Sequence, residues 1–184
     1  PELVTAYPRK AKSRHARLEA LLYERDQPAE TPDGRRVTLL SNIDLPDEVP
    51  VALDYGAEGI GLYRTEFLFI DREDLPREEE HFMHARGVLR RLAPFPATFR
   101  TFDLGVDKVA PFLGRLQTIN AGKGGVDEPN PALRLRSLRL CLRERALFKS
   151  QIRGLLRASV HGRMRLMFPM VSGVPELLST DTLV

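Results

Sequence analysis

The sequence predicts an α/β fold built on a parallel sheet. Three observations lead to this prediction. The 184 residues are enough for one domain with a substantial core, 42% of them are apolar, and short apolar runs alternate with longer stretches of helical spacing. Such alternation is typical of repeated βα units, in which parallel strands are joined by helices. We expect about four of these units after residue 36.

The first two predicted strands are VTLLSN at residues 37–42 and EGIGLY at residues 58–63. Both are apolar runs of strand length without polar alternation, which favours burial on both faces. The helix between them is expected from Asp44 to Tyr55. Pro46 suits its first turn, and Gly56 is a typical helix end.

The later elements continue the pattern. Glu78, Glu79 and Glu80, after Arg77, predict a helix start, because carboxylates stabilise a helix N-terminus. A Gly- and Pro-rich connection follows the third predicted strand, which is ATFRTF at residues 97–102. The remaining expected elements are helical spacing at 135–156, a strand at 164–168 (MRLMF) and a helix at 174–178.

Residues 1–27 predict an amphipathic linker helix, followed by a domain at residues 28–184. Two closures of the sheet remain open, a doubly wound sheet or part of a (β/α)8 barrel. In both, ligands bind at the carboxyl ends of the strands. Because the chain begins at Pro1 and stops soon after a strand, we expect it to be cut at both ends.

Composition narrows the class of protein. Basic residues outnumber acidic ones by 28 to 25, and the single cysteine excludes an internal disulfide. No apolar run reaches the roughly 18 residues of a membrane span, and no signal peptide is seen. These features favour a cytoplasmic protein without a membrane partner.

Three basic side chains lie at or near predicted strand ends: Arg64 follows the second strand, Arg100 lies within the third, and Lys108 follows the third. Guanidinium groups match phosphate or carboxylate with two parallel hydrogen bonds, so this arrangement predicts an anion site. The alternative is that the arginines only pair with Glu66 and Asp103 at the base of the loops.

Four motifs identify a family. GAEGIGLYRTEFLF with LPREEEHF, RTFDLGVDK, NPALRLRSLRLCL and QIRGLLRASVHGRMRLMFPMVS occur in this order. Over about residues 28–178 the sequence resembles the phosphoenolpyruvate-binding domain of enzyme I, the phosphoenolpyruvate-protein phosphotransferase of bacterial phosphotransferase systems. The resemblance implies a (β/α)8 barrel, of which this chain holds about the first half.

The resemblance also implies roles for residues. Arg64 and Arg100 would hold the phosphate and carboxylate of phosphoenolpyruvate, and Lys108 and Arg136 would belong to the same pocket. Family members pass the phosphoryl group to a histidine of their own N-terminal domain and then to the phosphocarrier protein HPr. An intact, Mg²⁺-dependent, homodimeric enzyme is therefore implied, serving sugar uptake or nitrogen regulation.

Departures from the family pattern define an alternative. Val106 and Arg134 replace motif glycines, and the acceptor histidine, the metal ligands and the catalytic cysteine lie in segments that this chain lacks. We therefore expect the fragment alone to be inactive, with a non-catalytic remnant as the alternative. We also expect a half barrel to self-associate through open edges and apolar surface, or to be partly disordered.

Three other features have competing interpretations. Residues 134–165 hold ten basic residues and one acidic residue, so a nucleic-acid-binding module is a further, weaker hypothesis. Cys141, flanked by leucines, is expected to be a buried structural thiol. His81 and His84 have a spacing that could seat zinc, but we expect a solvated helix start instead.

Overall fold

The computed structural model describes residues 21, 24–69, 72, 74–104 and 136–181. Most of the linker helix expected at 1–27 lies outside these residues, as do Val106, Lys108 and Arg134. The structural statements below concern the described part of the chain.

The described strands form one parallel sheet in the order β1-β2-β3-β4. A doubly wound sheet reverses its strand order at a switch point, whereas a (β/α)8 barrel adds its strands in sequence. The sequential order therefore decides between the two closures, and the predicted partial barrel is confirmed. The strands are β1 (Ser41–Ile43), β2 (Ile60–Tyr63), β3 (Pro96–Arg100) and β4 (Arg163–Met167).

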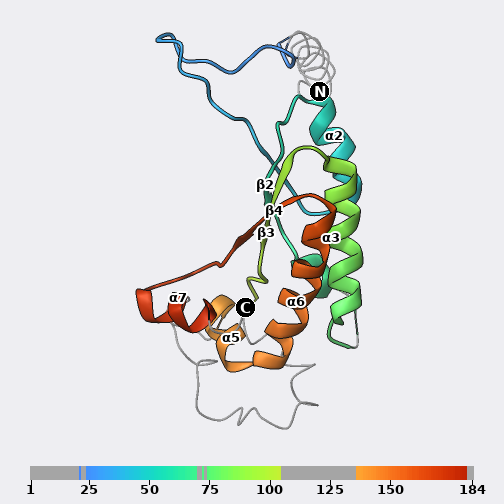
Figure 1. The fold of residues 1–184 in the computed structure, drawn as a ribbon, viewed down its shortest axis with the longest axis vertical. Coiled ribbons are helices and arrows are strands. Elements are labelled where there is room, and N and C mark those ends of the chain that lie inside the picture. Colours follow the sequence, from blue (N-terminus) through green and yellow to red (C-terminus); the bar gives the residue numbers. More distant parts are fainter. Residues whose placement is uncertain (1–20, 22–23, 70–71, 73, 105–135, 182–184) are drawn as a thin grey trace, which may run out of the picture.

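Helices follow each strand. Figure 1 shows α2, α3 and α6 together on one side of the sheet, as the outer helices of a barrel are arranged. Gly56 ends α2 with a φ of 80°, a conformation that glycine adopts without strain. The helices are η1 (Pro46–Glu48), α2 (Val49–Asp54), η2 (Glu66–Phe69), α3 (Glu78–Leu92), α5 (Ser137–Arg143), α6 (Arg145–Ala158), η3 (Ser159–His161) and α7 (Val174–Asp181).

The core lies between the sheet and these helices. Ile60 and Phe99 from the sheet pack with Val88, Leu89 and Leu155 from α3 and α6, and each of these side chains is almost wholly buried. A second cluster joins η2, α5 and α6 around Phe102 and Phe148. Because this second cluster lies beneath the carboxyl ends of β2 and β3, it supports the residues described in the next section.

The first strand differs from its prediction. Strand pairing begins at Ser41, and Val37 and Leu39 are 44% and 54% exposed, although the apolar run had indicated burial on both faces. The described β1 pairs only with β2. A second neighbouring strand would be needed to cover the other edge, so these two apolar side chains remain at the surface.

The histidine prediction also needs correction. His81 does not lie in a solvated helix start, since only 1% of it is exposed. Helix α6 crosses α3 closely at this point, because a Cβ added to Gly154 would lie 2.7 Å from Cβ of His81. This close crossing buries the imidazole.

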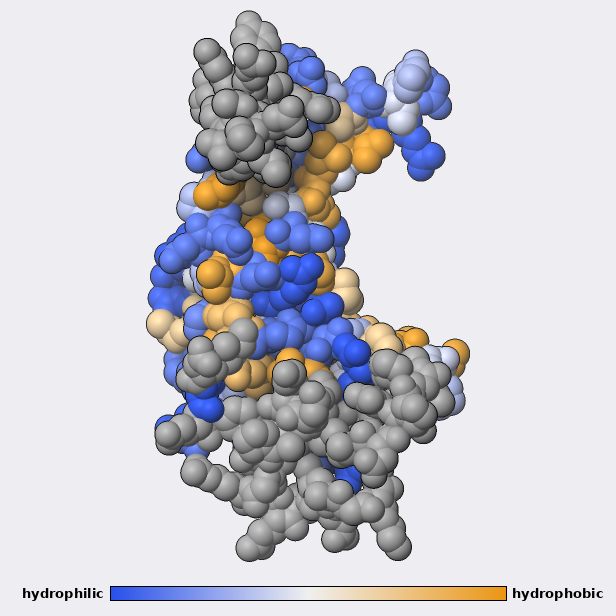
Figure 2. All heavy atoms as spheres, turned by 180° about the vertical axis from the view of Figure 1, so that it is seen from behind, coloured by the Kyte–Doolittle hydropathy of each residue, from blue (hydrophilic) through white to orange (hydrophobic). Residues whose placement is uncertain are grey.

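One face of the sheet stays open. Along β4, Arg163, Arg165 and Met167 are exposed, while the alternate residues pack toward the helices. Figure 2 shows polar and apolar residues intermixed on the described surface, which is hollowed on the side away from the helices. Within the described ranges, no helix is long and apolar enough to cross a membrane.

Candidate functional site

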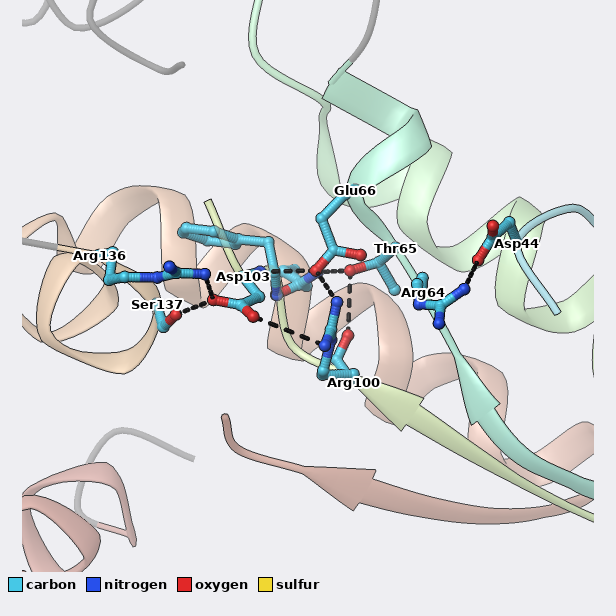
Figure 3. Close-up of polar contacts among 10 residues, drawn as sticks. Asp44, Arg64, Thr65, Glu66, Arg100, Asp103, Arg136 and Ser137 are labelled. Carbon is cyan, nitrogen blue, oxygen red and sulfur yellow. Dashed lines mark hydrogen bonds and ion pairs between the residues drawn. The ribbon is translucent and has the colours of Figure 1, made fainter. Parts of the chain in front are cut away.

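The candidate site lies where β2 and β3 end. Glu66 comes just after β2, Asp103 comes just after β3, and Arg136 precedes α5. Figure 3 shows these side chains converging with Arg100. The carboxyl ends of neighbouring parallel strands lie side by side, which brings residues distant in the sequence to one rim.

Alternating charges connect the rim. Arg100 donates from Nη2 to Oε1 of Glu66 at 2.9 Å, and its Nη1 lies 3.5 Å from Oδ2 of Asp103. Arg136 donates from Nη2 to Oδ1 of Asp103 at 2.8 Å. The side chains of Glu66, Arg100 and Asp103 are less than 20% exposed. Charged groups this far from water are held firmly in one geometry.

Asp103 is the centre of this network. Burial alone would raise its pKa, but hydrogen bonds from Ser137 and Arg136, together with the positive charges of Arg136 and Arg100, lower the pKa overall. Asp103 is therefore an anion at neutral pH. It fixes the Arg136 guanidinium and the first turn of α5 against the end of β3.

Some buried polar atoms of the site have no partner among the described residues. They are Nε of Arg100, Nε of Arg136 and Oε2 of Glu66. Buried polar groups are nearly always hydrogen-bonded in folded proteins, so unpaired ones need an explanation. The Arg136 side chain is 34% exposed, so the accessible part of its guanidinium can serve an anionic ligand.

Arg64 stands apart from this network. Its Nη1 donates to Oδ1 of Asp44 at 2.8 Å, and the side chain is 44% exposed. In Figure 3, Arg64 points away from Arg100 and toward Asp44. The structure thus brings Arg100 and Arg136 together and leaves Arg64 at the same end of the sheet with its own partner. Lys108 lies outside the described residues.

The pairing with acidic residues corresponds to the simpler of the two interpretations of the sequence. Arg100 contacts both Glu66 and Asp103, as expected for arginines at the base of loops. This pairing does not exclude an anion site, because a carboxylate partner positions a guanidinium and leaves its other donors free.

Sequence reasoning missed Thr65, Ser137 and Gln151, all of which are buried polar residues at the site. Gln151 had a detectable signal. It follows Phe148 by three residues and precedes Leu155 by four, so it occupies a core position in an otherwise apolar helical stripe. Thr65 and Ser137 carry no comparable pattern.

A metal does not fit the described residues. Among them, no group of three or more His, Cys, Asp or Glu side chains is placed to hold an ion. The carboxylates nearest the site, Glu66 and Asp103, are already held by arginines.

The other candidate residues have structural roles. Burial raises the pKa of the Cys141 thiol, which confirms the prediction of an inert buried cysteine. The basic segment is not one helix, since α5 and α6 are separated at Glu144. Several of its arginines are ion-paired, including Arg139 with Glu176 and Arg157 with Glu78 and Glu79.

Comparison with known proteins identifies the family. Residues 19–184 match the family described as PEP-utilising enzyme, PEP-binding domain. The chain is 43% identical over 178 residues to phosphoenolpyruvate-protein phosphotransferase of Priestia megaterium, covering 95% of this chain and 29% of that protein. The enzymes of the same name from Staphylococcus carnosus and Bacillus subtilis are 38% and 42% identical over 182 and 151 residues.

These matches cover 99% and 82% of this chain, and 30% and 25% of the two relatives. The chain thus spans about three tenths or less of the length of these relatives. The sheet order, the arginines at its carboxyl end and the match over residues 19–184 agree. The chain belongs to the PEP-binding domain family of PEP-utilising enzymes.

Proposed function

We propose that this chain is the phosphoenolpyruvate-binding part of a phosphoenolpyruvate-protein phosphotransferase. The observation that carries the proposal is the pair of arginines, Arg100 and Arg136, fixed at the carboxyl end of the sheet by Glu66 and Asp103. A sequence match of more than 40% identity to a protein of that name supports it. A degenerate remnant is not favoured.

The chemistry requires positioning and charge stabilisation. Phosphoenolpyruvate has a phosphate and a carboxylate, and the phosphoryl group is transferred with negative charge spread over its oxygens. Arg100 binds one of these anionic groups, with Arg136 beside it and Arg64 at the adjacent strand end. Lys108 adds a fourth cation. The residues of this chain bind and orient the substrate, and the acceptor histidine belongs to another part of the protein.

The proposal extends to the partners of the intact enzyme. The intact enzyme works with Mg²⁺, transfers the phosphoryl group from its own histidine to an HPr-type phosphocarrier, and acts as a homodimer in the cytoplasm. The names of the relatives support the transferase activity. The metal, the carrier and the dimer rest on the resemblance of the motifs.

Titration of the 184-residue chain with phosphoenolpyruvate tests the proposal. Arg100→Ala should abolish or severely weaken binding, because it leaves a buried substrate charge unpaired. That loss is about 2–5 kcal/mol in comparable buried pairs. Isothermal titration calorimetry measures the affinity, and circular dichroism verifies that the variant is folded.

Arg153→Ala is the matched control. It removes the same charge from α6, where Arg153 is 71% exposed and pairs with Glu78 on the outer surface. We expect its affinity to equal that of the unmodified chain. Absence of binding to the unmodified chain at millimolar phosphoenolpyruvate, or equal losses in both variants, would contradict the proposed site.

A further inference from the structure

Gln151 lies in the middle of α6 and is wholly buried. Both the nitrogen and the oxygen of its side-chain amide are hydrogen-bonded. Nε2 donates to Oγ1 of Thr65 at 3.0 Å, and Oε1 accepts from the backbone N–H of Phe102 at 3.1 Å. One helical side chain therefore binds both segments of the rim, which are 86 and 49 residues away in the sequence.

Thr65 closes the network. Its hydroxyl donates to the backbone carbonyl of Arg100 at 3.0 Å, so the same oxygen must accept the bond from Gln151. This direction fixes the orientation of the Gln151 amide. Figure 3 shows Thr65 beside the Arg100 carbonyl, with Arg64 pointing away on the other side.

The neighbours of these contacts are the site residues. Thr65 is followed directly by Glu66, and Phe102 is followed directly by Asp103. Glu66 then accepts two bonds across the same gap, from Nη2 of Arg100 and from the backbone N–H of Asp103 at 2.7 Å. The distance that Gln151 sets between Thr65 and Phe102 is thus the distance that these rim bonds span.

Packing alone does not account for a glutamine here. The position belongs to the apolar stripe of Phe148, Ile152 and Leu155, all of which are buried. A buried amide loses its bonds to water and is tolerated only where both of its ends are paired. A leucine would fill the same stripe without that requirement, so the amide indicates a need for directed bonds.

We propose that Gln151 is a positioning residue that holds the strand ends carrying Glu66, Arg100 and Asp103 at the spacing that binds phosphoenolpyruvate. This inference rests on the proposed function for its ligand. The geometric part of the inference is independent of the proposed function, because the contacts of Gln151 with Thr65 and Phe102 are present in this structure without a ligand.

The test compares Gln151→Leu with Leu155→Val in the full 184-residue chain. Leu155 is in the same stripe, one turn further along α6, and makes no polar contact with the rim. Calorimetry gives the affinity for phosphoenolpyruvate, and urea unfolding gives stability. We expect Gln151→Leu to weaken binding at least tenfold and Leu155→Val to leave it within twofold.

A ligand-free readout separates this inference from the proposed function. The acceptor of the Asp103 N–H is Glu66, not Gln151, so loss of the Gln151 bonds does not free this amide directly, whereas a change of rim spacing does. Hydrogen exchange of this amide should accelerate at least tenfold in Gln151→Leu, relative to amides in α3. If the unmodified chain does not bind phosphoenolpyruvate, the proposed function is contradicted. The role of Gln151 in setting the rim spacing is then tested by hydrogen exchange at Asp103 alone.

A double-mutant cycle gives a second measure. Thr65→Val removes the acceptor of Gln151 and the donor to the Arg100 carbonyl. Because both residues then act through the same contacts, the Asp103 amide of the double variant with Gln151→Leu should exchange about as fast as in the faster-exchanging single variant. Unchanged Asp103 exchange in Gln151→Leu, or effects of the two changes that multiply as independent ones do, would overturn the inference.

Discussion

At the scale of single residues, the buried imidazole of His81 has the most measurable consequence. Both ring nitrogens lack a partner among the described residues, and the pKa is lowered from 6.5 to about 4. Burial is the main cause. On its own helix, Glu80 opposes the shift and His84 adds to it. Arg72 adds to it from the preceding loop, and Phe69 and Gly154 face the ring without charge.

We therefore expect stability to fall as the pH is lowered through this range. The unfolded chain takes up the proton near pH 6.5 and the folded chain only near pH 4, so protonation favours unfolding between these values. The shift corresponds to about 3 kcal/mol, fully present as stability above pH 6.5 and lost toward pH 4. Urea unfolding at several pH values measures it.

His81→Leu provides the comparison. It keeps an apolar side chain of similar size in the same place and removes the titrating group, so its stability should depend much less on pH between 6.5 and 4. His161→Gln changes a histidine outside α3 and should retain most of the decline. Parallel pH profiles for His81→Leu and the unmodified chain would contradict the assignment.

Residue-scale prediction from sequence succeeded where chemistry was tied to a strand end and failed where it depended on long-range contact. Arg100 is predicted because it lies in the third strand, close to the carboxyl end where ligands bind. Gln151 is not, since its partners Thr65 and Phe102 lie far away in the sequence. The family motif supplied Arg136, which the basic spacing around it concealed. Burial of His81 depends on α6 crossing α3, and no local pattern reveals that crossing.

At the scale of elements, two helical glycines have opposite roles. Gly87 lies inside α3 with nothing within 4 Å of the position of an added Cβ. Gly154 lies inside α6, and its added Cβ would be 2.6 Å from the carbonyl oxygen of Glu78. The first glycine is exposed to open space, and the second allows the two helices to pack closely.

Alanine substitution should therefore act in opposite directions. Gly87→Ala should raise the free energy of unfolding by about 0.5–1 kcal/mol, because alanine has the better helix propensity. Gly154→Ala should lower it by about 1–3 kcal/mol through overpacking. Urea unfolding measures both variants. Destabilisation by Gly87→Ala would contradict this expectation.

The sequence predicted most elements to within a few residues, because helical spacing and apolar runs are local properties. The helix from the acidic run after Arg77 and the strand ending at Met167 are examples. The start of β1 was wrong for a different reason. Whether Val37 and Leu39 are covered depends on a second neighbouring strand, and a local apolar run carries no information about it.

At the scale of the whole molecule, the sheet has two edges without a partner among the described residues, at β1 and β4. Unpaired strand edges and exposed apolar side chains favour association with other chains. Leu39 lies beside the first edge, and Met167 lies on the second. Both side chains are exposed.

We expect the 184-residue chain to self-associate through these two edges and the apolar side chains beside them. Light scattering after size-exclusion chromatography should give a mass that increases with concentration. The combined change Leu39→Lys and Met167→Lys should reduce that mass. Val160→Lys adds the same charge at an 81% exposed site in η3 and should not. A monodisperse monomer that melts cooperatively would contradict this expectation.

The pairing of charges at the rim also has a kinetic consequence. Arg64, Arg100 and Arg136 are matched by Asp44, Glu66 and Asp103, so the described rim has little net field beyond the Debye length of about 8–10 Å. A trianion arriving from solution is then not steered toward it. Its association rate should depend only weakly on salt. Discrimination between anions should arise after contact, when the bound anion replaces a carboxylate as the partner of an arginine.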